Sequence, residues 1–226
     1  MFKFFERFKP REGQELPDYW QNYADSFSAG IAADSLLRTV RFVVVDTETT
    51  GLNPKTDRLL SVGAIGVQNW QINIADRFEV LLRQTQLPGK SDIEIHGILP
   101  VDKAGMLEES HAVESLLTFL GNAVLVGHHL GFDMEMLNRA LGRMNLPNLK
   151  NRVIDTHRLA IRVDPPSGGI AQPGLYTLDS LCAKYHIPAA DRHTAAGDAF
   201  LTAILFLKLA ARLEKRGVNT LAQLLK

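Results

Sequence analysis

The chain has 226 residues, and its 25 Lys and Arg balance 25 Asp and Glu, so the formal net charge is zero. A neutral chain gains no long-range attraction to nucleic acid from its overall charge, so such binding must use a local basic surface or bound cations. The single cysteine, Cys182, excludes an intrachain disulfide and a cysteine-rich zinc site. No apolar run of about 18 residues predicts a membrane span, and the charged start differs from a secretory signal. We therefore expect a cytoplasmic protein.

The first predicted unit is an N-terminal extension, residues 1–38, which differs in composition from the rest. It opens with aromatic and basic residues and contains a possible helix over 17–23. Such a segment either lies on a membrane or partner protein, or folds back on its own domain. The sequence leaves both alternatives open. We expect the main domain to cover residues 39–215 and a short tail to cover residues 216–226.

Apolar runs predict three strands at the start of the main domain. The Val-rich run 41–46 is typical of a buried central strand. The runs 58–67 and 71–82 follow it, and the short break between them favours an antiparallel hairpin.

Helices and strands alternate in the remainder of the chain. Periodicity and helix-breaking residues predict a helix over 113–120, a strand over 123–127, a helix over 132–143, a strand from 153, a loop over 165–174, and helices over 177–185 and 195–213. A hairpin followed by alternating strands and helices predicts a mixed β-sheet flanked by α-helices, in the α/β class.

Four carboxylates stand where these patterns predict apolar surroundings or a strand end. Asp46 and Glu48 are two residues apart at the end of the first strand, so both project from one face. An isolated pair of this kind is often just a solvated strand end. Asp133 opens a helix on its apolar side, where a helix cap is the alternative explanation. Asp198 lies several residues inside its predicted helix, where we expect capping to contribute little.

The carboxylates predict a particular kind of metal site. Like charges that converge are costly unless cations neutralise them. All-oxygen ligands select hard cations, and two such ions can clamp the attacking and leaving oxygens of a phosphodiester. We therefore expect two Mg²⁺ or Mn²⁺ ions. His193 is five residues before Asp198, and an imidazole can take a proton from water near neutral pH.

The histidines suggest zinc as an alternative metal. The histidines considered for it are His96, His128, His129 and His193. No pair of them has the i, i+4 spacing of a zinc-binding helix, and thiolates are absent, so the sequence disfavours zinc. We interpret His128 as a structural histidine.

Three segments resemble the exonuclease motifs of the DEDD-h superfamily. They occur in the family's order and read Asp46-Thr-Glu-Thr-Thr-Gly, Gly127-His-His-Leu-Gly-Phe-Asp133 and His193-Thr-Ala-Ala-Gly-Asp198. The resemblance covers roughly residues 41–213 and is greatest to the epsilon proofreading subunit of bacterial DNA polymerase III. It implies a ribonuclease H-like fold, two Mg²⁺ or Mn²⁺ ions, and stepwise release of nucleoside 5′-monophosphates from 3′ ends.

The resemblance also assigns roles to individual residues. The family's four metal ligands and its general base are matched by Asp46, Glu48, Asp133, Asp198 and His193. Thr49 and Leu52 resemble substrate contacts, and Leu52 resembles the apolar residue that wedges against the last base. His96 lies in a segment similar to the one that contacts the terminal nucleotide. One departure is His129, which stands where the family often has Asn.

Three functions remain open from the sequence. They are a DNA 3′→5′ exonuclease for proofreading or repair, an RNA-trimming enzyme with the same chemistry, and a catalytically silent interaction module. The presence of all five chemical residues argues against the third. Similarity to the epsilon subunit favours DNA, with a single-stranded or frayed 3′ end as substrate and a DNA polymerase or another replication or repair protein as a possible partner.

Overall fold

Five strands form one mixed sheet in the part of the chain that the computed structural model describes, residues 15–84, 105–169 and 174–226. The strands are β1 (Phe42–Thr49), β2 (Leu59–Gln68), β3 (Gln71–Leu81), β4 (Val124–Gly127) and β5 (Val153–Asp155), in the spatial order β3-β2-β1-β4-β5. β1 pairs antiparallel with β2 and parallel with β4, so it is central, as its Val-rich run predicts. The predicted α/β class is confirmed.

The predicted hairpin between β2 and β3 closes on two residues. Asn69 and Trp70 have φ values of 50° and 59°, and Gln68 pairs with Gln71 across the turn. Two successive left-handed residues give the turn whose twist matches that of the flanking strands. The ring of Trp70 stacks on Phe42 with centroids 6.3 Å apart, which fixes the hairpin against the core.

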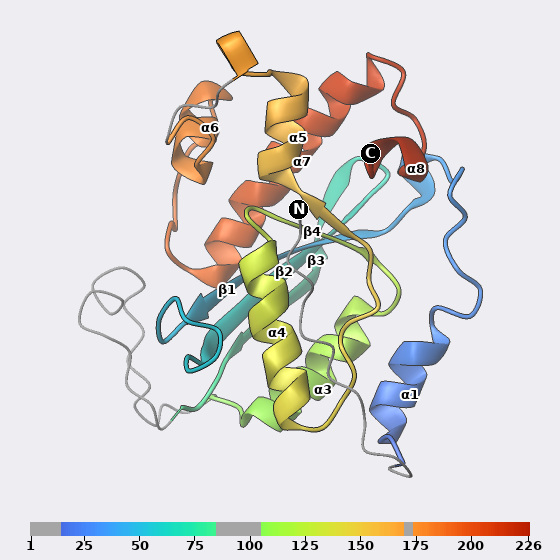
Figure 1. The fold of residues 1–226 in the computed structure, drawn as a ribbon, viewed down its shortest axis with the longest axis vertical. Helices are drawn as coiled ribbons and strands as arrows, with labels where there is room; N and C mark the ends of the chain where they lie inside the picture. Colours follow the sequence, from blue (N-terminus) through green and yellow to red (C-terminus); the bar gives the residue numbers. More distant parts are fainter. Residues whose placement is uncertain (1–14, 85–104, 170–173) are drawn as a thin grey trace.

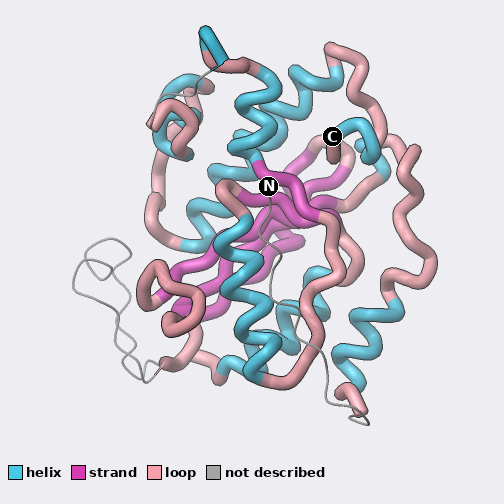
Figure 2. The backbone as a smooth tube through the Cα atoms, in the orientation of Figure 1, coloured by secondary structure: helices cyan, strands magenta, loops and turns pink. Residues whose placement is uncertain are grey.

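Helices cover both faces of the sheet, as Figures 1 and 2 show. One face packs against α1 (Asp18–Asp25), α3 (Glu109–Leu120) and α4 (Gly131–Arg143). The other packs against α5 (Thr156–Val163), α6 (Leu178–Lys184), α7 (Ala195–Glu214) and α8 (Leu221–Leu224). Single 3₁₀ turns occupy Leu37–Thr39 and Ser167–Gly169. None of the helices in the described ranges has the length and apolarity needed to cross a bilayer.

The described part of the N-terminal extension packs on the main domain. Trp20 and Tyr23 of α1 are buried in the same core as the apolar residues of α3 and α4. The Tyr23 hydroxyl donates to Asn151 Oδ1 at 2.5 Å. Farther along, the backbone N–H of Leu37 donates to the carbonyl of Asn219 at 3.0 Å, so the extension also contacts the C-terminal segment. Residues 15–38 therefore fold back on the chain; residues 1–14 lie outside the described ranges.

Alternation along β1 sends successive side chains to opposite helix layers. Val44 contributes to the core on the α7 side, whereas Val45 contributes to the core on the α4 side. Because side chains alternate along a strand, Asp46 and Glu48 continue the first series and Thr47 continues the second. The end of β1 therefore presents carboxylates toward α7 and a hydroxyl toward α4.

Gly63 lets the start of α7 lie directly on the sheet. It is the partner of Asp46 in the register of β1 and β2. A Cβ placed on Gly63 would lie 2.3 Å from both Ala195 C and Ala196 N, a separation that no side chain tolerates. The missing side chain therefore allows the first turn of α7 to lie beside Asp46.

We predict that Gly63→Ala destabilises the fold by about 1–3 kcal/mol, the usual cost of overpacking. The added methyl group would meet backbone atoms of α7, which have no rotamer through which to yield. Gly131→Ala is the matched control, since a Cβ there has no other atom within 4 Å. That change should be neutral or stabilise the protein by about 0.4–1 kcal/mol. Urea unfolding measures both variants, and equal stability would contradict the close approach.

Candidate active site

Three carboxylates from two elements meet at the end of β1. One oxygen from each of Asp46, Glu48 and Asp198 lies within 4.8 Å of the other two. Asp46 and Glu48 belong to β1, and Asp198 belongs to the first turn of α7. Asp133, in the first turn of α4, is buried and acts electrostatically on both Asp46 and Glu48. The structure thus brings together the four acidic residues that the sequence singles out.

A buried hydrogen bond connects the α4 side of this group to β1. Thr47 lies between the two acidic residues of the strand, and its hydroxyl donates to Asp133 Oδ1 at 2.7 Å. Both residues are buried. The bond fixes one oxygen of Asp133 relative to β1. Thr47 was not among the predicted site residues. Its position between Asp46 and Glu48 could have indicated that it lies at the site.

Asp198 lies at the start of α7 without capping it. The helix begins at Ala195, as predicted, and its N-cap is Thr194, whose hydroxyl accepts the backbone N–H of Gly197. Asp198 Oδ2 accepts the backbone N–H of His193, which precedes the N-cap, at 3.2 Å. Capping therefore contributes little, as expected, although a carboxylate in the first turn still gains from the helix dipole.

Burial and mutual repulsion disfavour the charged forms of these carboxylates. Burial, followed by the charges of Asp133, Asp198 and Glu48, raises the pKa of Asp46 well above its usual range. Burial and then the charges of Asp198 and Asp133 raise the pKa of Glu48 to about 7. Burial also raises the pKa of Asp133 to about 7, against the opposing hydrogen bond from Thr47. Oxygen donors that repel one another fit hard divalent cations such as Mg²⁺ or Mn²⁺.

Arg192 places a guanidinium against the carboxylate group. Its Nη1 pairs with Asp198 Oδ1, and its Nε donates to Asp179 Oδ1 at 2.6 Å. Its charge lowers the pKa of Asp46 and Glu48, in opposition to the neighbouring carboxylates. Arg192 was not among the predicted site residues. Its place directly before the third motif is the local signal for it.

The remaining predicted residues lie at the margin of the group or outside the described ranges. His193 is exposed, with φ of 65°, and its backbone contacts Asp198. Leu52 follows the end of β1 with 84% of its surface exposed. Thr49 is buried, and its hydroxyl donates to the carbonyl of Gly51 at 2.8 Å, so it supports that turn. His96 lies outside the described residues.

Sequence comparison identifies relatives of this chain. Residues 43–206 match the Exonuclease family (RNase_T). The PolC-type DNA polymerase III of Thermotoga petrophila is 29% identical over 198 residues, which is 86% of this chain and 14% of the polymerase. The same polymerase type from Halalkalibacterium halodurans is 33% identical over 179 residues, which is 78% of this chain and 12% of the polymerase. The chain thus spans a small part of these relatives.

Comparison with solved structures identifies the same fold. Escherichia coli exonuclease I, solved with a dT13 oligonucleotide, superposes with a TM-score of 0.68 at 20% identity, over 79% of this chain and 43% of that one. Exonuclease X, solved with 5′ overhanging duplex DNA, gives 0.60 at 21% identity, over 82% of this chain and 99% of that one. The predicted ribonuclease H-like arrangement is confirmed. With the family match over residues 43–206, the chain belongs to the exonuclease family of the DEDD superfamily.

Proposed function

We propose that the chain is a 3′→5′ exonuclease that hydrolyses the terminal phosphodiester bond of DNA and releases nucleoside 5′-monophosphates. Two Mg²⁺ or Mn²⁺ ions would be held by its four acidic residues: Asp46, Glu48, Asp133 and Asp198. The observation that carries this proposal is the convergence of carboxylates from β1, α4 and α7, whose charged forms are disfavoured by burial and repulsion. Such a group is costly to the fold and gains from bound cations.

The surrounding residues support distinct steps in this reaction. When bound, the two cations would neutralise the carboxylates and stabilise charge on the attacking and leaving oxygens of the phosphodiester. Thr47 orients Asp133 through its hydrogen bond. His193 has an exposed side chain and is tied by its backbone to Asp198, so it can accept a proton from water at this site. The exposed Leu52 would pack against the terminal base.

The choice of DNA over RNA is part of the proposal. It is supported by the PolC-type DNA polymerases among the relatives, and by two structural neighbours that were solved with DNA. RNA trimming uses the same chemistry and is the alternative, since discrimination depends on what meets the 2′-hydroxyl. We include a replicative DNA polymerase as the proposed partner, because the relatives contain the matching region within polymerase chains.

End-labelled substrates test the function and its polarity directly. Single-stranded DNA, duplex DNA with a mismatched 3′ end, and short RNA are incubated side by side with the full chain and Mg²⁺. We expect a ladder of products shortened from the 3′ end of DNA and slower shortening of RNA. Faster loss of RNA would establish the RNA alternative, and intact substrates in all lanes would establish a silent module.

Removing a metal ligand should abolish activity while the fold is kept. We expect no detectable nuclease activity for Asp46→Ala or Asp198→Ala, and loss of activity on adding EDTA that Mg²⁺ or Mn²⁺ reverses. Asp34→Asn, an exposed residue outside the site, is the matched control and should retain full activity. Circular dichroism verifies folding. Full activity of either alanine variant would refute the ligand assignment.

Removing a general base should lower the rate of turnover and leave substrate binding nearly unchanged. We predict that His193→Ala lowers kcat by about 10²–10⁴-fold with little change in KM, the usual range for such a group. A variant within a few-fold of wild type at every pH would remove His193 from this role.

The raised carboxyl pKa values predict how stability depends on pH. A carboxyl whose pKa is higher in the folded state binds more protons there than in the unfolded chain, so it lowers stability as pH rises. For Glu48 and Asp133, the pH range over which stability falls ends near their folded-state pKa values of about 7. In EDTA, we expect the Tm of wild type to fall relative to Asp46→Asn/Glu48→Gln between about pH 4 and pH 7. Mg²⁺ should reverse the fall, whereas a Tm difference independent of pH would contradict the repulsion.

A further inference from the structure

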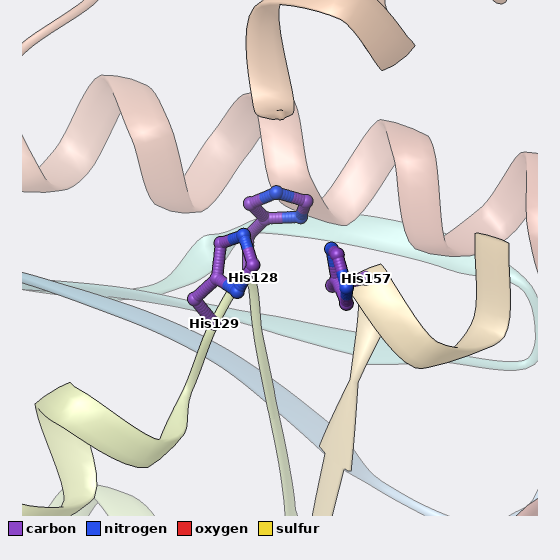
Figure 3. A group of neighbouring side chains, drawn as sticks. All are labelled: His128, His129 and His157. Carbon is purple, nitrogen blue, oxygen red and sulfur yellow. The ribbon is translucent and has the colours of Figure 1, made fainter. Parts of the chain in front are cut away.

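Three histidines form a second group of potential ligands, shown in Figure 3. His128 and His129 directly follow β4, and His157 lies in the first turn of α5, directly after β5. One nitrogen from each imidazole lies within 4.8 Å of a nitrogen of each of the other two. The ring centroids are 4.3–6.1 Å apart, and the rings are grouped around a common space.

Backbone contacts hold the two segments together. Gly127 and Asp155 are register partners in the parallel pair of β4 and β5. Asp155 Oδ1 accepts the backbone N–H of His129 at 3.0 Å and that of His157 at 2.9 Å. A single carboxylate oxygen therefore fixes the positions from which two of the three imidazoles project. The group lies at the carboxyl ends of adjacent parallel strands, where α/β folds commonly bind ligands.

Hydrogen bonds determine which ring nitrogens have free lone pairs. The Thr156 hydroxyl donates its proton to the Gly127 carbonyl at 3.1 Å, so it accepts from His128 Nδ1 at 2.9 Å. The Tyr176 carbonyl can only accept, so His157 Nδ1, at 3.3 Å, carries its proton. His157 is thereby left with an unprotonated Nε2, and so is His128 in the tautomer that donates to Thr156. Nε2 of His128 is fully buried and makes no hydrogen bond. Outer hydrogen bonds of this kind orient metal-binding histidines.

We propose that His128, His129 and His157 bind a transition-metal ion of the Zn²⁺ class at a site separate from the carboxylates. Imidazole nitrogens favour Zn²⁺ and similar ions over Mg²⁺. Three of them leave a fourth position for water or a phosphate oxygen. Tetrahedral binding with Zn–N distances of about 2.0–2.1 Å places nitrogens about 3.3 Å apart, so the rings would move inward on binding.

The charge state of the rings agrees with this assignment. Burial and the two neighbouring imidazoles lower the pKa of His128 to about 3, against a smaller opposing effect of the Tyr176 carbonyl. Burial and then His157 lower the pKa of His129. Neutral imidazoles are the form that coordinates metal. The sequence disfavoured zinc because no histidine pair has helical spacing and thiolates are absent. This group instead joins two adjacent histidines after β4 with a third from the first turn of α5.

Metal binding to a chain without the acidic site tests the proposal independently of nuclease function. The full chain carrying Asp46→Asn/Asp198→Asn is freed of metal by a chelator and titrated with Zn²⁺ by calorimetry, and with Co²⁺ by visible absorption. We expect one equivalent of either ion, and a Co²⁺ spectrum typical of tetrahedral nitrogen ligation. His129→Asn and His157→Gln, added singly to that background, should raise Kd at least tenfold.

Two features of these variants keep the test decisive. His129 is exposed and has φ of 57°, a backbone conformation that Asn tolerates, so His129→Asn should fold. His111→Gln, an exposed histidine on α3, is the matched control and should bind as the parent does. Absence of stoichiometric Zn²⁺ binding by the parent would overturn the proposal. So would an unchanged Kd in either His129→Asn or His157→Gln.

Discussion

Four carboxylates repel one another at the end of β1, and the positions of β1, α4 and α7 determine how strong that repulsion is. Each carboxylate that comes from a helix has a local group that offsets part of the cost. Asp198 accepts the backbone N–H of His193, just before α7, and Asp133 accepts the hydroxyl of Thr47. Asp46 and Glu48 lie in a strand, which offers no comparable dipole. The central strand therefore carries the charges that most require a cation.

The sheet geometry is arranged so that this repulsion is unavoidable. Alternation along β1 directs Asp46 and Glu48 toward α7, and the absence of a side chain at Gly63 lets α7 approach until its first turn lies beside them. A bulkier residue at that position would separate the charges and relieve the repulsion, but it would also separate the ligands. The repulsion at this end of the sheet lowers the stability of the fold, and burial of the two apolar cores on either face offsets that loss.

The parts of this structure that are predictable from the sequence are those governed by local periodicity. The Val-rich β1, the hairpin and the apolar helix faces follow from spacings of two and of three to four residues, and so does the common orientation of Asp46 and Glu48. The hydrogen bond from the backbone of His193 to Asp198 depends on the loop before α7, whose conformation the helical periodicity does not specify. The contacts of Arg192 and of His157 depend on strand register and helix approach, which no local pattern of residues encodes.

Arg192 connects the two groups of potential ligands. Its guanidinium pairs with Asp198 and also lowers the pKa of His128, so one cationic side chain acts on the carboxylates and on the imidazoles. A divalent ion bound by the carboxylates would reduce the same repulsion as the guanidinium does, and the two cations would compete for Asp198. Because Arg192 also pairs with the exposed Asp179, it keeps a partner when it releases Asp198. The cost of exchanging one cation for the other is therefore smaller than the cost of removing a charge from an unpaired carboxylate.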